Sequence, residues 1–302
     1  MPEIRIPAFA KVNLCLDILG KRPDGYHELR TIFQTISLHD DLRLRSSRTA
    51  GISLAIHGNQ TLSQEPPRNN LVYKAVNVLR RELKIRTGAE IELHKNIPAG
   101  RGLGGGSSDA AAALLGYLRL TKRSLPLARL VAIASSLGAD VPFFLFGGRA
   151  LGIGKGDETY PLPDMRNRAI LIISPNGIHV HTADAYRWLK APALTKNRSA
   201  SKLFRFCALC WSAQWGALSN DFEAVVFRRH PRLAAIKRAL LRGGAAEASL
   251  AGSGSAVFGV FPSPALARRA AVGFPDDQAL VCETLSRDKY LRSVQGRAVI
   301  AI

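Results

Sequence analysis

Residues 96–113 read NIPAGRGLGGGSSDAAAA. Five of the seven residues at 100–106 are glycine, so this backbone has few Cβ atoms that could keep a bulky anion at a distance. A strand-like run precedes the glycines at 90–94, and an alanine-rich, helix-forming run follows them. Ser107, Ser108 and Asp109 are good N-cap residues for that helix, and a helix N-terminus attracts phosphate. The stretch therefore predicts the phosphate-binding loop of a nucleotide-using enzyme.

The two most familiar phosphate-binding loops do not fit this stretch. No Gly-Lys-Ser/Thr follows the glycines, so it is not the loop of the P-loop enzymes. It is not the dinucleotide fingerprint either, because Gly102 and Gly104 are followed by Ser107 where a third glycine is required. An ordinary glycine turn is the remaining alternative. However, glycines and serines set directly against an alanine-rich helix are an uncommon way to make one.

Composition indicates a globular protein of two domains. The chain has 302 residues, of which 47% are hydrophobic, and no run of about 18 apolar residues that would span a membrane. Met1–Pro7 contains no apolar signal segment. The scattered cysteines at 15, 207, 210 and 282 do not form a disulfide framework and are typical of a reducing compartment. We therefore expect a cytoplasmic protein. Cys207 and Cys210 have a spacing used by metal and redox sites, although buried structural thiols are the favoured interpretation.

The net charge of +19 raises the question of a nucleic-acid partner. The basic residues are spread along the chain, with short local runs at 196–205 and 228–232, and they do not alternate with aromatic residues as in single-strand binders. The charge is therefore interpreted mostly as a basic bias of the whole proteome, together with attraction for an anionic substrate. We expect no nucleic-acid partner, no membrane partner, and a monomer or weak homodimer.

The pattern of apolar residues predicts alternating strands and helices. Strands are expected at 10–19, 31–38, 41–46, 52–57 and 89–94, and on both sides of a hairpin-like turn at Gly147-Gly148. Helices are expected at 70–83, 108–120 and 127–137, the last ended by Gly138. Prolines and polar residues at 157–167 indicate a domain boundary. A strand at 169–174, a helix at 182–189, a helical region at 221–242, a strand at 255–261 and a helix after Pro264 follow. The expected domains are 1–160 and 161–302.

Two more segments accompany the glycine-rich loop: AFAKVNL at 8–14 and LAGSGSAVFG at 250–259. Together the three resemble the signature motifs of the GHMP small-molecule kinases, in order and spacing, over the whole chain. The resemblance implies an α+β, two-domain fold. It has an N-terminal ATP-binding α/β domain with the phosphate loop and a C-terminal ferredoxin-like α+β domain. It also implies ATP as co-substrate, with Mg²⁺ bridging the phosphates.

Four further segments narrow the resemblance to one branch of that family: RPDGYHEL at 22–29, LGADVPFF at 137–144, TADAY at 182–186 and SNDFE at 219–223. This branch phosphorylates the 2-hydroxyl of a cytidine diphosphate ester of methylerythritol. The sequence departs from the family pattern at Phe9, where proline is usual, and at Ala251, where a hydroxyl residue is usual. A homoserine or mevalonate kinase, a nucleotide sensor without turnover and a basic RNA-binding protein are the competing readings.

The resemblance assigns roles to particular residues. Asp140 is the expected base and Lys11 its cationic partner at the reacting hydroxyl. A lysine inside an apolar run is itself unusual, and Asn13 shares its strand face. The expected substrate-binding residues are Asn13, Tyr26, His27, Thr182 and Tyr186, with cytosine between the two tyrosines. The expected ATP-binding residues are Lys95, Pro98, Ala99, Gly100, Arg101, Gly102, Leu103, Gly104, Gly105, Gly106, Ser107 and Ser108. No protein metal site is expected, because His179 and His181 have no third ligand nearby in the sequence.

Overall fold

The first of two β-sheets is built on a long hairpin of β1 (Glu3–Lys21) and β2 (His27–Ser47). The computed structural model describes residues 2–189, 200–211 and 218–295. The strand order is β3-β4-β2-β1-β8, and β5 pairs with the first part of β2 and with β6. The remaining strands of this sheet are β3 (Ile52–His57), β4 (Gly88–His94), β5 (Arg149–Gly154), β6 (Glu158–Pro161) and β8 (Ser219–Asn220).

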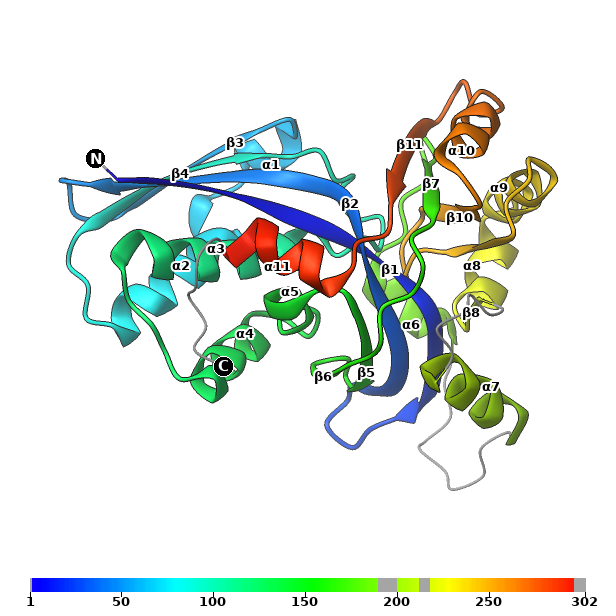
Figure 1. The fold of residues 1–302 in the computed structure, drawn as a ribbon, viewed down its shortest axis with the longest axis horizontal. Coiled ribbons are helices and arrows are strands. Elements are labelled where there is room, and N and C mark those ends of the chain that lie inside the picture. Colours follow the sequence, from blue (N-terminus) through cyan, green and yellow to red (C-terminus); the bar gives the residue numbers. More distant parts are fainter. Residues whose placement is uncertain (1, 190–199, 212–217, 296–302) are drawn as a thin grey trace.

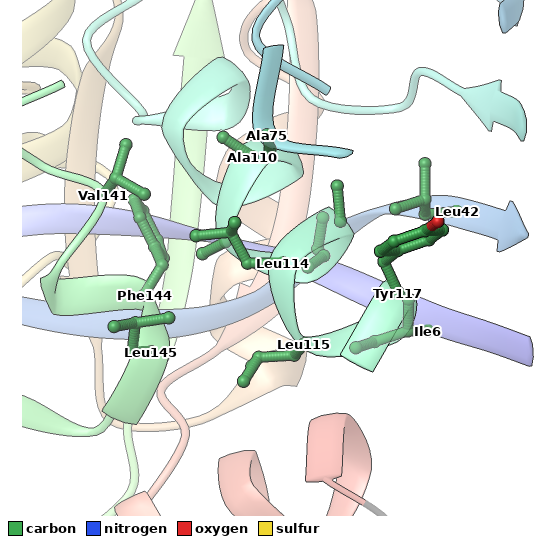
Figure 2. Packing of buried hydrophobic residues seen from close by; sticks show 14 of the residues in the cluster. Ile6, Leu42, Ala75, Ala110, Leu114, Leu115, Tyr117, Val141, Phe144 and Leu145 are labelled. Carbon is green, nitrogen blue, oxygen red and sulfur yellow. The ribbon is translucent and has the colours of Figure 1, made fainter. Parts of the chain in front are cut away.

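Helices cover one face of this sheet (Figure 1). They are α2 (Leu71–Glu82), α3 (Gly105–Thr121), α4 (Leu127–Leu137), α5 (Phe143–Phe146) and the C-terminal α11 (Arg287–Gln295), while α1 (Gln60–Gln64) and the 3₁₀ helix η1 (Pro67–Asn69) connect β3 to α2. Nearly every residue of α3 from Ser108 to Leu118 is buried, as expected for a helix that is apolar all round. Figure 2 shows Ala110, Leu114 and Tyr117 of α3 packed with Ile6, Leu42 and Phe144. This core holds the start of α3, and with it the glycine-rich loop, against the sheet.

The second sheet is antiparallel with the order β11-β7-β10-β9. Its strands are β7 (Ala169–Ser174), β9 (Glu247–Leu250), β10 (Val257–Phe261) and β11 (Gln278–Glu283). The other helices of this half are α6 (Thr182–Leu189), α7 (Ala200–Trp211), α8 (Glu223–Arg229), α9 (Pro231–Arg242) and α10 (Pro264–Ala271). In chain order this is a 4-1-3-2 sheet with helical crossovers, which is the split β-α-β arrangement. The prediction of an α+β fold with a ferredoxin-like C-terminal half is confirmed.

The chain returns twice from the C-terminal half to the first sheet. The short strand β8 pairs in parallel with β1 at Cys15 and Leu16. The helix α11 packs against α3, α5 and β1, and the Tyr290 hydroxyl donates a hydrogen bond to the Phe144 carbonyl. The two halves are therefore joined by more than one segment, and the site described below lies between them.

Several local predictions are wrong. The expected strands at 31–38 and 41–46 are one strand, because the polar pair His39-Asp40 lies within β2 and Asp40 is fully buried there by hydrogen bonds. The run before Gly147 is a helix, not a strand, since a short apolar run does not distinguish the two. The region 221–242 is two helices that meet at His230.

The strands β9 and β11 and the helix α11 were not anticipated, and the start of the basic run at 196–205 lies outside the described residues. All four cysteines are free thiols, but Cys207 is exposed rather than buried, and Cys210 is half-buried. Within residues 2–189, 200–211 and 218–295, no helix is long and apolar enough to cross a membrane.

Candidate functional site

A cavity of about 1140 Å³ opens between the two halves. Its walls come from β1, the glycine-rich loop, the turn after α4, the start of α6 and the loop between β9 and β10. Nearly all the predicted site residues line it: Lys11, Asn13, Tyr26, His27, Lys95, Pro98, Ala99, Gly100, Arg101, Gly102, Leu103, Gly104, Gly105, Gly106, Ser107, Asp140, Thr182 and Tyr186. Segments distant in the sequence therefore meet in one cavity, as one active site would require.

The glycine-rich loop ends by forming the N-terminus of α3. The helix begins at Gly105, and Gly104, with φ at +74°, is its N-cap. The prediction that Ser107, Ser108 or Asp109 would cap the helix is therefore wrong, because these residues lie inside its first turns. The first helical hydrogen bond runs from the Ser108 N–H to the Gly104 carbonyl. The N–H groups of residues 105–107 precede it and are available to an anion in the cavity.

Close backbone contacts fix the shape of this loop. The Lys11 N–H donates to the Leu103 carbonyl at 3.0 Å, which ties the loop to β1. A Cβ at Gly102 would lie 1.8 Å from the Ala251 carbonyl oxygen, so only glycine fits against the loop of the C-terminal half. A Cβ at Gly104 would lie 2.8 Å from the Phe144 ring. The glycines are thus needed for packing as well as for the approach of a ligand.

Lys11, Asn13 and Asp140 form the polar centre of the cavity. Lys11 and Asn13 lie on one face of β1, and the Lys11 Nζ donates to the Asn13 Oδ1 at 2.7 Å. The Asp140 Oδ2 lies 3.5 Å from the same Nζ. The lysine side chain is 5% exposed and the aspartate side chain 32% exposed, so the carboxylate faces the cavity while the ammonium lies behind it. The Asn13 amide donates in turn to the Thr31 hydroxyl at 2.7 Å, which fixes the amide orientation.

Asp140 is held by the way α4 ends. Gly138 ends the helix, and the Val141 N–H donates to its carbonyl at 3.1 Å, which closes a turn around Asp140. The buried side chains of Val141, Phe143 and Phe144 then anchor the chain in the core beneath α3. The Asp140 carboxylate thus projects from a turn, and the residues that follow the turn are fixed in the core.

A second charged cluster lies under the glycine-rich loop. The Lys95 ammonium contacts Asp40 and, at 2.6 Å, Asp109, and all three side chains are buried. Asp40 also accepts the N–H of Ile97 at 2.7 Å. Burial would lower the pKa of Lys95, but Asp109 and Asp40 outweigh burial and raise it. Burial raises the pKa of Asp109 to about 8, opposed by Lys95. Lys95 therefore reaches the cavity as a cation held by two carboxyl groups.

An aromatic group forms the part of the cavity beside the β1–β2 hairpin. The rings of His27 and Tyr186 stack with their centroids 4.6 Å apart, and Tyr26 is 60% exposed next to them. The Lys155 ammonium lies over the Tyr26 ring at 4.9 Å. Burial and then Lys21 lower the pKa of His27, which favours its neutral form. One face of the Tyr186 ring is thus covered by His27, and the expected sandwich of cytosine between Tyr26 and Tyr186 stays a prediction.

Two features were not anticipated from the sequence. Ser108, expected among the ATP-binding residues, is buried within α3 and does not line the cavity, and its hydroxyl has no partner in the described part of the chain. Conversely, residues from α1, η1 and the start of α2 do line it: Leu62, Glu65, Asn69, Asn70 and Leu71. Lys155 was also missed. None of them belongs to a recognisable motif, and only the N-cap pattern of Asn70 gave any local signal.

The described residues offer no ready-made metal cage. No group of three or more His, Cys, Asp and Glu side chains in these parts of the chain could hold an ion. The carboxylates that reach the cavity beside the loop, Asp109 and Asp140, are each in contact with a lysine. A hard divalent cation here would take most of its oxygen ligands from phosphates and water.

Comparison with known proteins agrees with this geometry. The sequence pattern described as "GHMP kinases N terminal domain" matches residues 70–148, and "GHMP kinases C terminal" matches residues 198–277. The chain is 46% identical over 296 residues to the 4-diphosphocytidyl-2-C-methyl-D-erythritol kinase of Solibacter usitatus, covering 97% of this chain and 92% of that protein. It is 41% identical to the enzyme of the same name from Pelotomaculum thermopropionicum, covering 92% and 97%.

Comparison with solved structures agrees with the sequence comparison. A crystal structure of a 4-(cytidine 5'-diphospho)-2C-methyl-D-erythritol kinase superposes with a TM-score of 0.75 at 33% identity, covering 93% of this chain and 99% of that chain. A homoserine kinase from Cytophaga hutchinsonii superposes with a TM-score of 0.69 at 20% identity, covering 95% of both chains. The second likeness shows a common fold only.

Gly106→Val should weaken nucleotide binding without unfolding the protein. A Cβ at Gly106 meets only the Leu71 side chain, at 3.9 Å, so the folded chain has room for it, but the added methyl groups project beside the free N–H groups of α3. We expect the Kd for ATP, measured by calorimetry, to rise at least about tenfold. The melting temperature should match that of a control, Ala265→Val on α10. Unchanged ATP affinity in the folded variant would place the phosphates elsewhere.

Asp109 should make stability depend on pH. The pKa of Asp109 in the folded state lies above the ordinary value of 3.8. Its contribution to the free energy of unfolding is therefore fully present below about pH 4 and is lost as the pH rises toward about 8. In Asp109→Asn this loss should disappear. We expect the drop in unfolding free energy between pH 5 and pH 8, measured with urea, to be smaller in the variant by more than about 1 kcal/mol. The exposed Asp288→Asn should keep the wild-type drop, and an equal drop in Asp109→Asn would contradict the assignment.

Proposed function

The chain belongs to the family of 4-diphosphocytidyl-2-C-methyl-D-erythritol kinases, and we propose that it transfers the γ-phosphoryl group of ATP to the 2-hydroxyl of that cytidyl substrate. This is a step of the non-mevalonate route to isoprenoid precursors. The observation that carries the proposal is the meeting, in one cavity, of the Lys11–Asp140 pair, the free N–H groups of the glycine-rich loop and the aromatic group around Tyr26.

The two substrates enter from different parts of the cavity. ATP places its phosphates at the N-terminus of α3, where free N–H groups and the helix dipole stabilise negative charge. Its base then lies against Leu62, Asn69 and Leu71, which come from α1, η1 and α2, and α1 and α2 lie far from the turn that joins β1 to β2 (Figure 1). The cytidyl group lies near the hairpin, where Tyr26 offers an exposed ring and His27 a ring nitrogen for the edge of the base.

The reaction centre lies between these two ends. The acceptor hydroxyl loses its proton to the Asp140 carboxylate as its oxygen forms a bond to the γ-phosphorus, and the bond from that phosphorus to the bridging oxygen breaks to release ADP. Lys11 stabilises the negative charge on the attacking oxygen. Asn13, fixed by its hydrogen bond to Thr31, orients a neighbouring hydroxyl of the polyol. Burial and, to a lesser extent, the nearby Asp140 carboxylate raise the pKa of the Tyr186 phenol to about 12. The carboxylate is therefore adjacent to the cytidyl end.

Mg²⁺ is proposed to arrive with the nucleotide. The protein supplies few free oxygen ligands, so the ion would be bound mainly by the β- and γ-phosphates and water, with the Ser107 hydroxyl at the cavity wall as a further ligand. When bound, the ion neutralises charge on the phosphates. The domain division at 160/161, the cytoplasmic location and the monomeric or weakly dimeric state also remain proposals.

A coupled ADP-release assay tests the acceptor. We expect turnover with the cytidyl substrate and none above background with homoserine or mevalonate. Tyr26→Ala should raise the KM for the cytidyl substrate about 5- to 150-fold, because base stacking on an aromatic ring contributes roughly 1–3 kcal/mol. The KM for ATP should change much less. Equal turnover of homoserine, or a rise confined to the KM for ATP, would refute this placement of the acceptor.

Asp140→Asn tests the chemistry, because it keeps the shape of the side chain and removes the proton acceptor. We expect kcat to fall about 10²- to 10⁴-fold with substrate binding largely kept. Lys11→Met should also lower kcat. The double variant should be little worse than the poorer single one, since both residues act on one hydroxyl. Melting temperatures control for folding. Near-normal turnover by a folded Asp140→Asn enzyme would show that positioning and phosphate charge suffice without a carboxylate base.

A further inference from the structure

The charged side chains that line the cavity are almost all paired. Lys11 lies 3.5 Å from Asp140, Lys95 is held by Asp40 and Asp109, and the Lys155 ammonium lies 3.6 Å from Asp157. Among the lysines and arginines that line the cavity, Arg101, in the middle of the glycine-rich loop, is the exception. Within the described parts of the chain its guanidinium has no carboxylate partner, and burial alone lowers its pKa. A buried cation without a counter-charge is costly unless a ligand supplies one.

The orientation of Arg101 is fixed by the C-terminal half. Its Nη1 donates to the Ile178 carbonyl and, at 2.6 Å, to the Ser255 hydroxyl. The Ser255 hydroxyl donates to the same carbonyl at 3.0 Å, so the three groups hold one another. The backbone is fixed as well, because a Cβ at Gly254 would lie 2.3 Å from the Arg101 carbonyl carbon. An arginine side chain is flexible in water, and here it is held in one place before any ligand arrives.

Most of the donors of Arg101 remain unused. A guanidinium has five N–H donors, and the two bonds above use those of Nη1. The other two nitrogens, Nε and Nη2, form no hydrogen bond with any described residue. Neither atom is fully buried, so both can still be reached. Arg101 as a whole is 8% exposed and is one of the residues that line the cavity, so a ligand there could reach these donors. Their forked geometry matches two oxygens of a phosphate group.

We propose that Arg101 binds a phosphate group of a bound substrate through Nε and Nη2, held ready for it by Ser255 and Ile178. The proposal rests on the proposed function, in which both substrates carry phosphates: the triphosphate of ATP and the diphosphate of the cytidyl substrate. Arg101 contacts neither Lys11 nor Asp140 in the structure. The proposal assigns Arg101 to a phosphate that does not react, so that its contribution would be equal in the ground state and the transition state.

Steady-state kinetics of Arg101→Met test this assignment. A charge-assisted hydrogen bond to phosphate predicts a rise of about 10- to 150-fold in one KM, with kcat changed less than about threefold. A rise in the KM for ATP identifies the triphosphate, and a rise in the KM for the cytidyl substrate identifies the diphosphate. Arg101→Lys keeps the charge but loses the forked geometry, so its KM should lie between those of Arg101→Met and the wild type. Ser255→Ala, which frees the side chain, should raise the same KM by a smaller factor.

A matched control separates phosphate binding from packing. Arg119 is also a partly buried arginine that donates to a carbonyl, that of Val294 at 2.9 Å, but it lies outside the cavity. Arg119→Met should leave both KM values unchanged. In Arg101→Ala, millimolar guanidinium should restore part of the lost affinity, which a merely structural role would not allow. Unchanged KM values, or a fall confined to kcat, in folded Arg101→Met would overturn the proposal.

Binding measurements keep this test independent of the reaction. Calorimetry with ADP and with CDP reports phosphate binding even if the enzyme does not turn over the cytidyl substrate. Loss of affinity for either diphosphate in Arg101→Met, but not in Arg119→Met, supports the assignment. Equal affinities in all three proteins would overturn it. Absence of turnover in the wild type would instead contradict the proposed function alone.

Discussion

The active site depends on the direct backbone contact between the glycine-rich loop and the loop of residues 251–255. Gly102 lies so close to the Ala251 carbonyl that no side chain fits between them, and a Cβ at Gly254 would lie only 2.3 Å from the Arg101 backbone. On its other side the loop is bonded to β1 through Lys11. A loop rich in glycine would be mobile by itself. Because the loop is held between the two sheets, its position is fixed, and this position sets the distance from the proposed phosphate site to the proposed reacting groups on β1.

The core beneath the loop gives this wall its support. The helix α3 is buried on all sides, so its N-terminus cannot shift without disturbing the sheet, α2 and α5 together. The same packing fixes Asp140, since the residues after it are buried against α3. The free N–H groups at the start of α3 and the carboxylate proposed as the base are therefore positioned by one core. Phosphoryl transfer needs little covalent help from the protein and depends on such positioning.

Charge is distributed around the cavity in three different ways. Lys95 is held by two buried carboxyl groups, one of which, Asp40, also holds the segment that leads into the loop. Lys11 is only partly balanced by Asp140, which is open to the cavity and free to take a proton. Arg101 has no acidic neighbour in the described chain, so its counter-charge would come with a substrate. The cavity therefore holds three cations in three different electrostatic settings, which agrees with the different roles proposed for them.

The sequence by itself determined the fold class, and nearly all the residues that it predicted for the site, those of the glycine-rich loop among them, line the cavity. These follow from local signals: glycine density, apolar periodicity and short motifs such as those around Tyr26 and Asp140. The helix 127–137 and the strand 169–174 were predicted with their observed limits for the same reason. Tertiary structure decided the rest. Asp40 could be read as a strand breaker until its burial beside Lys95 was known, and Ser108 could be read as a ligand until it was found inside α3. The stacking of His27 on Tyr186 and the clamp on Arg101 join residues more than 70 positions apart. Such contacts depend on how the elements pack, which no local pattern encodes.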